Sequence, residues 1–209
     1  EIQRKEIPEA LSYQKMFSLQ MLEFFPFEWL TLSMASSAIW GKRFEIGYLN
    51  PLMYPVIHQN LHGDFDNVTQ SVNFSFHLPS YARFYFSFFA DEMEVSDLKN
   101  FFSNPRNMIA IQAGTKIPVP FFPFSLFTFQ YTKIEPFVYT HYPEENYSTS
   151  SGPVDLSYSD DGENLGSPLP PNSDEFLVNI GARILPHLNC SVQFQLIRHG
   201  TNDRDIAGD

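Results

Sequence analysis

Val72–Leu78, with the sequence VNFSFHL, alternates apolar and polar side chains without a break. Every even-numbered position is apolar and every odd-numbered position is polar. After the turn Pro79-Ser80 the same pattern returns in Ala82–Phe88, ARFYFSF. Because successive side chains of a β-strand point to opposite faces, this period of two predicts two strands joined by a short connection.

The same alternation recurs along much of the chain, in the segments 16–21, 28–34, 108–117, 127–132, 175–184 and 189–196. We expect the strand that begins at 127 to continue toward Tyr139. An aromatic content of 16% suits strands, and 16 prolines argue against long helices. The sequence therefore predicts about eight strands, with short turns on one side and long loops on the other.

Two architectures give period-two alternation, a soluble sandwich and a membrane barrel. The polar positions hold Asn, Gln, Ser, Thr, His and Gly more than Lys and Glu, and bulky Phe recurs on the apolar side, which favours the barrel. No stretch approaches the roughly 20 apolar residues of a transmembrane helix, so strands would have to cross the membrane. The sequence predicts an all-β, antiparallel transmembrane β-barrel of the bacterial outer membrane, of which these strands are part; a two-sheet sandwich is the alternative.

The alternation also assigns the two faces of the predicted wall. The polar residues expected to face the interior are Asn73, Ser75, His77, Gln112, Asn179, Gln193 and Gln195. The apolar residues expected to face outward are Phe74, Phe76, Phe84, Phe86, Phe129, Val178 and Phe194.

We expect residues 1–209 to belong to one barrel domain with two interruptions. Residues 40–65 have Gly and Pro punctuation and no strand period, which indicates an irregular insert. Residues 44–65 of this insert are expected to fold against the lumen or rim without extending the wall. Residues 142–174 are rich in Ser, Pro, Gly and acids, which predicts a long loop. We expect this loop on the extracellular side.

Charge and motifs exclude several classes of function. The net charge of −11 argues against a nucleic-acid partner, which needs a basic face. Cys190 is the single cysteine, so no disulfide within the chain and no cysteine-based metal site can form. The sequence lacks a nucleophile elbow, a phosphate loop, a dinucleotide fingerprint and a His-Glu-x-x-His motif. We therefore expect no enzyme, no cofactor and no metal.

Three clusters could carry chemistry, but each has a simpler interpretation. Asp91-Glu92 could be a carboxylate pair, yet neighbours on a strand point to opposite faces. His58, His62 and Asp64 have a spacing that suits a helical metal site, but no fourth ligand is evident. The acidic run Asp155–Asp161 with Glu163 could hold Ca²⁺, although it matches no EF-hand pattern. We interpret them as a solvated strand end, a polar loop segment and a solvated loop.

Particular segments carry a family resemblance. They are Phe44–Leu52 (FEIGYLNPL), Ile134–His141 (IEPFVYTH), Gly162–Gly166 (GENLG) and Pro171–Asp174 (PNSD). Over roughly residues 14–198 the chain resembles the Wzi-like capsule-assembly family of bacterial outer-membrane proteins. The resemblance implies a monomeric barrel that acts as a surface lectin for capsular polysaccharide. The chain has too few strands for the large barrels of that family and lacks an aromatic last residue, so we expect part of a larger barrel.

Candidate glycan contacts lie at the end of one strand and in the long loop. Glu135, Tyr139 and His141 have odd-numbered spacing, so on a strand they would share one face at the mouth of the lumen. Their ring and carboxylate chemistry suits sugars, although packing within the lumen would explain them equally. The long loop adds three side chains that can bond sugar hydroxyls, Asn164, Asn172 and Asp174.

Three functions remain open. The first is a non-enzymatic outer-membrane protein that contacts lipid and binds or surface-attaches an extracellular polysaccharide. The second is a porin or channel for small solutes. The third is an outer-membrane hydrolase with carboxylates at the lumen or rim. Bilayer conductance separates the second from the first, and a change in polysaccharide chain length separates the third from the first.

Overall fold

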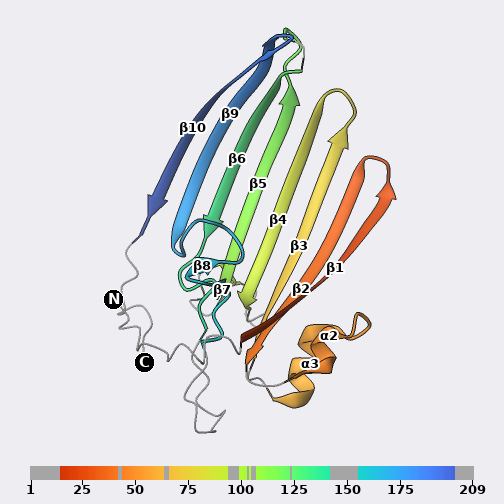
Figure 1. The fold of residues 1–209 in the computed structure, drawn as a ribbon, viewed down its shortest axis with the longest axis vertical. Coiled ribbons are helices and arrows are strands. Elements are labelled where there is room, and N and C mark those ends of the chain that lie inside the picture. Colours follow the sequence, from red (N-terminus) through yellow and green to blue (C-terminus); the bar gives the residue numbers. More distant parts are fainter. Residues whose placement is uncertain are drawn as a thin grey trace. The chain divides into compact units, whose positions relative to one another are not determined.

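The computed structural model describes residues 15–41, 44–63, 66–93, 99–102, 104, 107–122, 124–141 and 155–200. These residues form mainly one antiparallel sheet of eight strands, in the order β1-β2-β3-β4-β5-β6-β9-β10 (Figure 1). The strands are β1 (Lys15–Phe27), β2 (Leu30–Gly41), β3 (Asn67–Leu78), β4 (Ala82–Glu92), β5 (Met108–Pro118), β6 (Leu126–Ile134), β9 (Ser173–Leu185) and β10 (Leu188–His199). The predicted all-β, antiparallel fold with about eight strands is confirmed.

The strand order explains how short and long connections alternate. Chain neighbours are also sheet neighbours, so four short turns lie at one end of the strands: residues 28–29, 79–81, 119–125 and 186–187. The longer connections lie at the opposite end. Within the described residues β1 and β10 are the edge strands, so the sheet is open and its closure into a barrel stays a prediction.

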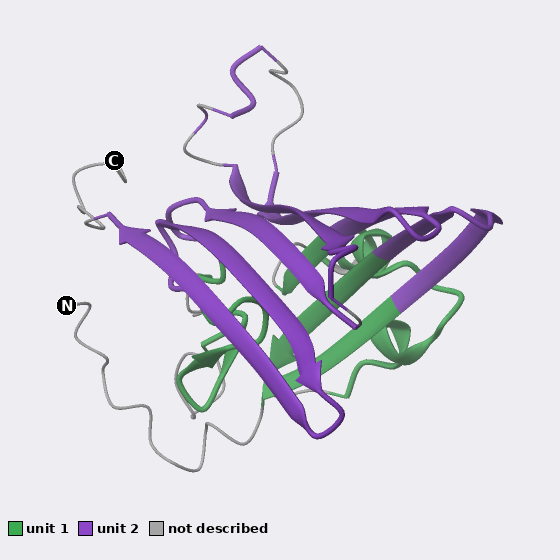
Figure 2. Ribbon diagram, turned by 90° about the horizontal axis from the view of Figure 1, so that it is seen from above, with its two compact units in different colours: residues 1–20, 35–70, 139–168 green, residues 21–34, 71–138, 169–209 purple. Residues whose placement is uncertain are grey.

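The chain divides into two units (Figure 2). Unit 1 comprises residues 1–20, 35–70 and 139–168, and unit 2 comprises residues 21–34, 71–138 and 169–209. Strands β4, β5, β6, β9 and β10 lie entirely in unit 2 and pair antiparallel, with register shifts only near the ends of β4 and β10.

Unit 1 contains the segment without a strand period, and this segment forms two short helices. They are α2 (Ile46–Leu49) and α3 (Pro55–His62). Pro55 begins α3, where its fixed φ suits a helix and its missing N–H costs nothing. Gly63, with φ 88°, follows the last turn in a backbone conformation that glycine tolerates. None of the described helices has the length and apolar character needed to cross a membrane.

The core of unit 1 gathers around Tyr48. Its ring lies 4.9 Å from Trp40, and its hydroxyl donates to Asp66 Oδ2 at 2.6 Å. His58 packs edge-on against the same ring at 4.7 Å and lies 3.0 Å from a carboxylate oxygen of Glu45. All but Glu45 are buried. The hydrogen bond between Tyr48 and Asp66 offsets the cost of removing these two buried groups from water.

Strand β6 ends earlier than the sequence predicts. Its last residue is Ile134, and residues 136–139 form a turn in which Phe137 and Tyr139 have φ of 66° and 73°. Pro136 cannot donate to a strand partner, and the left-handed backbone that follows cannot continue a strand. The expectation that Glu135, Tyr139 and His141 share one face of a single strand is therefore wrong.

Candidate functional site

The register of unit 2 builds a polar face across five strands. Because paired residues of antiparallel strands share a face, three rows of side chains align on this side. The rows are Arg83–Lys116–Thr128–Asn179–Gln193, Tyr85–Gly114–Gln130–Leu177–Gln195 and Ser87–Gln112–Thr132–Glu175–Ile197. Most positions carry amides, hydroxyls or charges, as the alternation in the sequence predicts.

A hollow of about 570 Å³ opens on this face of unit 2. All eight strands of the sheet contribute polar side chains to its lining, and Glu23 comes from β1. The polar lining residues are Glu23, Thr31, Ser33, Asn73, Ser75, Arg83, Tyr85, Ser87, Gln112, Lys116, Thr128, Gln130, Asn179 and Gln193. Leu177, Phe74 and Phe86 also border the hollow, although the register places Phe86 in a row of the opposite face. The hollow is large enough for a small organic ligand and offers mainly uncharged hydrogen-bonding groups.

Tyr85 crosses the floor of the polar face because residue 114 has no side chain. A Cβ on Gly114 would lie 2.4 Å from the Tyr85 ring and hydroxyl and 2.8 Å from the backbone oxygen of Phe129. The Tyr85 hydroxyl reaches over the glycine and donates to Gln130 Oε1 at 2.9 Å. An aromatic ring that covers a strand glycine in this way holds its neighbours in register.

The network continues from Gln130 into the buried part of the face. The amides of Gln130 and Gln112 both donate to Thr132 Oγ1, at 3.4 Å and 3.2 Å. At the other side of the hollow, Arg83 Nε donates to Ser75 Oγ at 2.7 Å and Asn73 Nδ2 donates to Ser33 Oγ at 3.0 Å. All of these bonds except that between Gln130 and Thr132 join different strands, and together they restrain the lining side chains, so the hollow is preorganised.

The opposite face of the same strands is apolar and exposed. Its rows are Ile117–Phe127–Ile180–Val192, Phe84–Thr115–Phe129–Val178–Phe194 and Phe86–Ala113–Tyr131–Phe176–Leu196. Phe84 is 44% exposed and Phe194 is 62% exposed. A sandwich would bury these rings between two sheets, and unit 2 does not bury them. In these strands the residue sets predicted to face opposite ways do so; which face is the interior stays a prediction.

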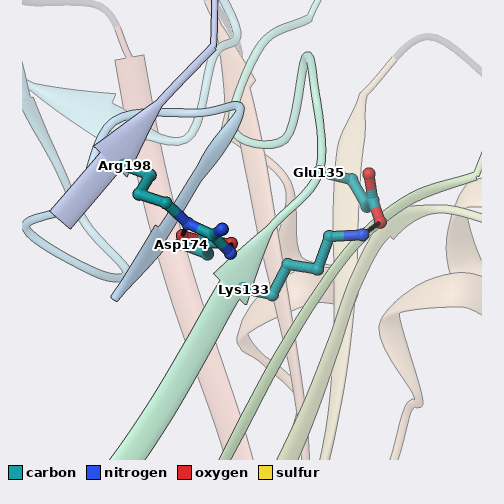
Figure 3. Close-up of polar contacts among 4 residues, drawn as sticks. All are labelled: Lys133, Glu135, Asp174 and Arg198. Atoms are coloured by element: carbon teal, nitrogen blue, oxygen red, sulfur yellow. Dashed lines mark hydrogen bonds and ion pairs between the residues drawn. The ribbon is translucent and has the colours of Figure 1, made fainter. Parts of the chain in front are cut away.

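A charged row ends the apolar face at the side of the long connections (Figure 3). Beyond the Tyr131–Phe176 ring pair, which is 4.7 Å apart, Lys133, Asp174 and Arg198 align in register. Arg198 binds both carboxylate oxygens of Asp174. Lys133 Nζ donates to a carboxylate oxygen of Glu135 at 2.5 Å. The hydrogen bond from Arg198, more than any other neighbour, holds the pKa of Asp174 below its usual range.

In unit 1, Tyr139 is held by the segment that carries β7 (Ser159–Asp160) and β8 (Glu163–Asn164). Its ring stacks on Tyr158 at 5.9 Å, and its hydroxyl accepts the backbone N–H of Ser167 at 3.1 Å. A Cβ on Gly166 would lie 2.7 Å from the ring, so the backbone approaches it closely. Tyr139 is only 4% exposed, so its ring would have to move to contact a ligand.

The structure divides the six predicted glycan contacts between the two units. Unit 1 holds Tyr139, His141, whose backbone N–H donates to Ser157 Oγ at 3.3 Å, and Asn164, which pairs with Ser159 across the β7–β8 ladder.

The other three predicted contacts lie in unit 2. Glu135 and Asp174 bind the cations of the charged row. Asn172 has φ 58°, and its backbone N–H donates to the backbone carbonyl oxygen of Glu135 at 3.2 Å. All three are thus engaged in contacts that shape the chain.

One of the two candidate metal sites lies partly outside the described residues, because Asp64 and the side chain of His62 are not described. The other, the acidic run Asp155–Asp161 with Glu163, lies within them, although residues 142–154 before it do not. Among the residues that the structure describes, no three His, Cys, Asp or Glu side chains come together as metal ligands. Asp91 and Glu92 end β4, where the register with β5 shifts.

The residues missed as site candidates are Arg83, Tyr85, Lys116 and Gln130. Their strands were predicted, but a side chain joins a site only through the register of its strand with the next. Searches against family models, curated proteins and solved structures find no match to this chain. A function for this chain therefore has to be inferred from the geometry of the polar and apolar faces of the unit 2 sheet.

Proposed function

We propose that this sheet is part of the wall of a bacterial outer-membrane β-barrel whose polar face binds extracellular polysaccharide, without catalysis. The observation that carries the proposal is the contrast between the faces of one sheet. A network of amides and hydroxyls lines a hollow on one face, and exposed phenylalanines cover the other. Exposed apolar surface on this scale is costly in water and favourable against lipid.

Strand length supports a membrane span. A transmembrane β-strand needs roughly 9–11 tilted residues. Strands β4, β5, β6, β9 and β10 have 11, 11, 9, 13 and 12 residues. Each is long enough to cross a hydrocarbon layer while its backbone groups bond to neighbouring strands, as the absence of water there requires.

The two ends of the apolar face support the same proposal. At one end the Tyr131–Phe176 pair precedes the charged row. At the other, Phe121 and Phe124 are 85% and 80% exposed in the turn between β5 and β6. Transmembrane barrels carry aromatic residues at both membrane–water interfaces. We expect the charged row to lie at the headgroup level, outside the hydrocarbon.

The chemistry of the hollow supports a polyhydroxylated ligand. Amides such as Gln112, Asn179 and Gln193 donate and accept at once, which matches sugar hydroxyls. Each contact contributes on the order of 1 kcal/mol, so useful affinity comes from many repeats of a polymer. The resemblance to the Wzi-like capsule-assembly family points to capsular polysaccharide, and a monomer is the expected state.

A porin for small solutes is the second candidate, and the hollow itself favours it. A polar face beside water would also line a channel. The two functions differ in what they require: a porin needs a continuous aqueous path, and a polysaccharide-binding protein needs retention of polymer.

Spin labelling tests the membrane assignment directly. In a Cys190→Ser background, nitroxide labels at Phe194→Cys and at its neighbour Gln193→Cys report the two faces of β10. After reconstitution in lipid vesicles we expect oxygen, which concentrates in lipid, to relax the label at 194. We expect a water-soluble nickel chelate to relax the label at 193. Equal access of the chelate to both labels would contradict a membrane wall.

Two further measurements separate the functions. Retention of native surface polysaccharide on immobilised protein, with unchanged polymer length, supports the binding function. Stepwise conductance in planar bilayers, without retention, would replace it with the porin. Shortened polymer would instead indicate a hydrolase.

A further inference from the structure

Two cations lie directly opposite each other on the polar face. Arg83 on β4 and Lys116 on β5 are register partners, and both line the hollow. Like charges at directly opposed positions of a sheet repel, so the sequence places them there at a cost to stability. Lys116 Nζ also lies 6.0 Å from the centre of the Tyr85 ring, which turns it toward the middle of the same face.

Neither cation has an acidic partner among the described residues. This contrasts with the charged row, where Lys133 and Arg198 each bind a carboxylate. The chain has 24 acidic and 13 basic residues, so carboxylates are not scarce. Glu23 lines the hollow without forming an ion pair with either cation, and Glu175 accepts a hydrogen bond from Gln195.

From this unpaired arrangement we infer that the hollow binds the carboxylate of an acidic polysaccharide, with Arg83 and Lys116 as the groups that recognise it. The inference rests on the proposed function and names its substrate class. Arg83 uses Nε to donate to Ser75 Oγ, which leaves its terminal nitrogens to donate to a carboxylate. Lys116 supplies a second positive charge from the neighbouring strand.

The rest of the lining favours a sugar acid over a bare inorganic anion. A hollow of about 570 Å³ is far larger than one small ion. Thr128, Asn179 and Gln193 lie in the same row as the two cations and offer groups that match hydroxyls. A sugar acid would satisfy both sets of groups. Its carboxylate would bind the two cations, and its hydroxyls would bond to the neutral row.

The test compares ligands and then variants. With the full-length protein in detergent micelles, calorimetry measures binding of oligogalacturonate, of a neutral maltooligosaccharide of equal length, and of sulfate. We expect oligogalacturonate to bind about tenfold or more tightly than the neutral sugar, since charge-assisted hydrogen bonds are the stronger ones. Its affinity should fall as salt rises, and sulfate should compete only weakly.

Charge removal then locates the site. We expect Arg83→Gln/Lys116→Gln to lose most of the preference for oligogalacturonate. The matched control Lys133→Gln/Arg198→Gln removes the same charge from the other face and should keep that preference. Because the first pair of substitutions removes a repulsion, thermal unfolding should show a fold at least as stable as the wild type. The salt dependence of the unmodified protein is a readout that needs no variant.

The outcomes separate the two proposals. Equal affinity for acidic and neutral sugars would overturn the inference and leave polysaccharide binding in place. Sulfate binding as tight as that of oligogalacturonate would overturn the assignment to a glycan. Loss of the preference in the control variant, or its retention in Arg83→Gln/Lys116→Gln, would show that the hollow is not the site.

Discussion

The two faces of the unit 2 sheet stabilise the same strands by different means. On the polar face, side chains hydrogen-bond across strands, as Tyr85 does to Gln130 and Gln112 to Thr132. On the apolar face, rings pack beside one another, yet much of their surface stays exposed. The side chains of the polar face therefore hold one another in place, whereas the apolar face still has surface to bury against a partner. Lipid is the partner that the proposed function supplies.

An introduced charge should give the largest difference in stability between the two faces. Val178 and Asn179 are neighbours on β9 and point to opposite faces. We expect Val178→Arg to destabilise the protein in lipid vesicles by about 2–4 kcal/mol, because the charge would enter the hydrocarbon. Asn179→Arg should change stability by less than about 1 kcal/mol, since the proposed wall turns residue 179 toward water. Urea unfolding from vesicles measures both, and equal costs would remove the distinction between the faces.

Substitution of Gly114, the glycine beneath Tyr85, should give the next largest loss of stability. A methyl group at Gly114 would meet the Tyr85 ring and the immovable backbone oxygen of Phe129. We expect Gly114→Ala to cost about 1–3 kcal/mol, as overpacking does, and to break the bond from Tyr85 to Gln130. Thermal unfolding monitored by circular dichroism measures the cost.

Gly181 on β9 is the matched control for Gly114. A Cβ there would have its nearest neighbour, the Ser191 Cβ, at 3.7 Å, which is ordinary contact. Gly181→Ala should therefore be tolerated. If both alanine variants unfold at the temperature of the wild type, Tyr85 does not depend on the glycine.

Strands and faces could be predicted because alternation is local to each strand. The pairing of Arg83 with Lys116 could not, because it depends on the register between strands and no single segment encodes it. The helices α2 and α3 were missed because residues 46–62 carry no strong helical period, and Tyr48 holds them through tertiary contacts. The early end of β6 depends on positive φ at Phe137 and Tyr139, which such residues rarely adopt.

One threonine on each face of the sheet allows the same substitution to be made on both. Thr132, on the polar face, accepts hydrogen bonds from two glutamines. Thr115, on the apolar face between Phe84 and Phe129, has a buried hydroxyl with no hydrogen-bond partner among the described residues. We expect Thr132→Val to destabilise by about 1 kcal/mol and Thr115→Val to stabilise by a similar amount. Denaturant midpoints measure both, and the same sign for the two variants would contradict the comparison.

The smallest expected effect on stability concerns the charged row at the end of the apolar face. The pKa of Asp174 is lowered in the folded state, chiefly by the hydrogen bond from Arg198. A carboxyl with a depressed pKa contributes stability above its unfolded pKa and loses it as pH falls through the folded value. Below about pH 4, the ordinary range for Asp, the wild type should therefore lose stability more steeply than Asp174→Asn. Because the Arg198 side chain is largely exposed, the difference should be small and should shrink further in high salt. Unfolding midpoints measured between neutral and strongly acidic pH test this, with Arg198→Gln as a second variant that removes the same hydrogen bond. Parallel pH profiles for the wild type and both variants would show that the Asp174–Arg198 ion pair contributes nothing to stability. In that case only the Tyr131–Phe176 ring pair would mark this end of the apolar face.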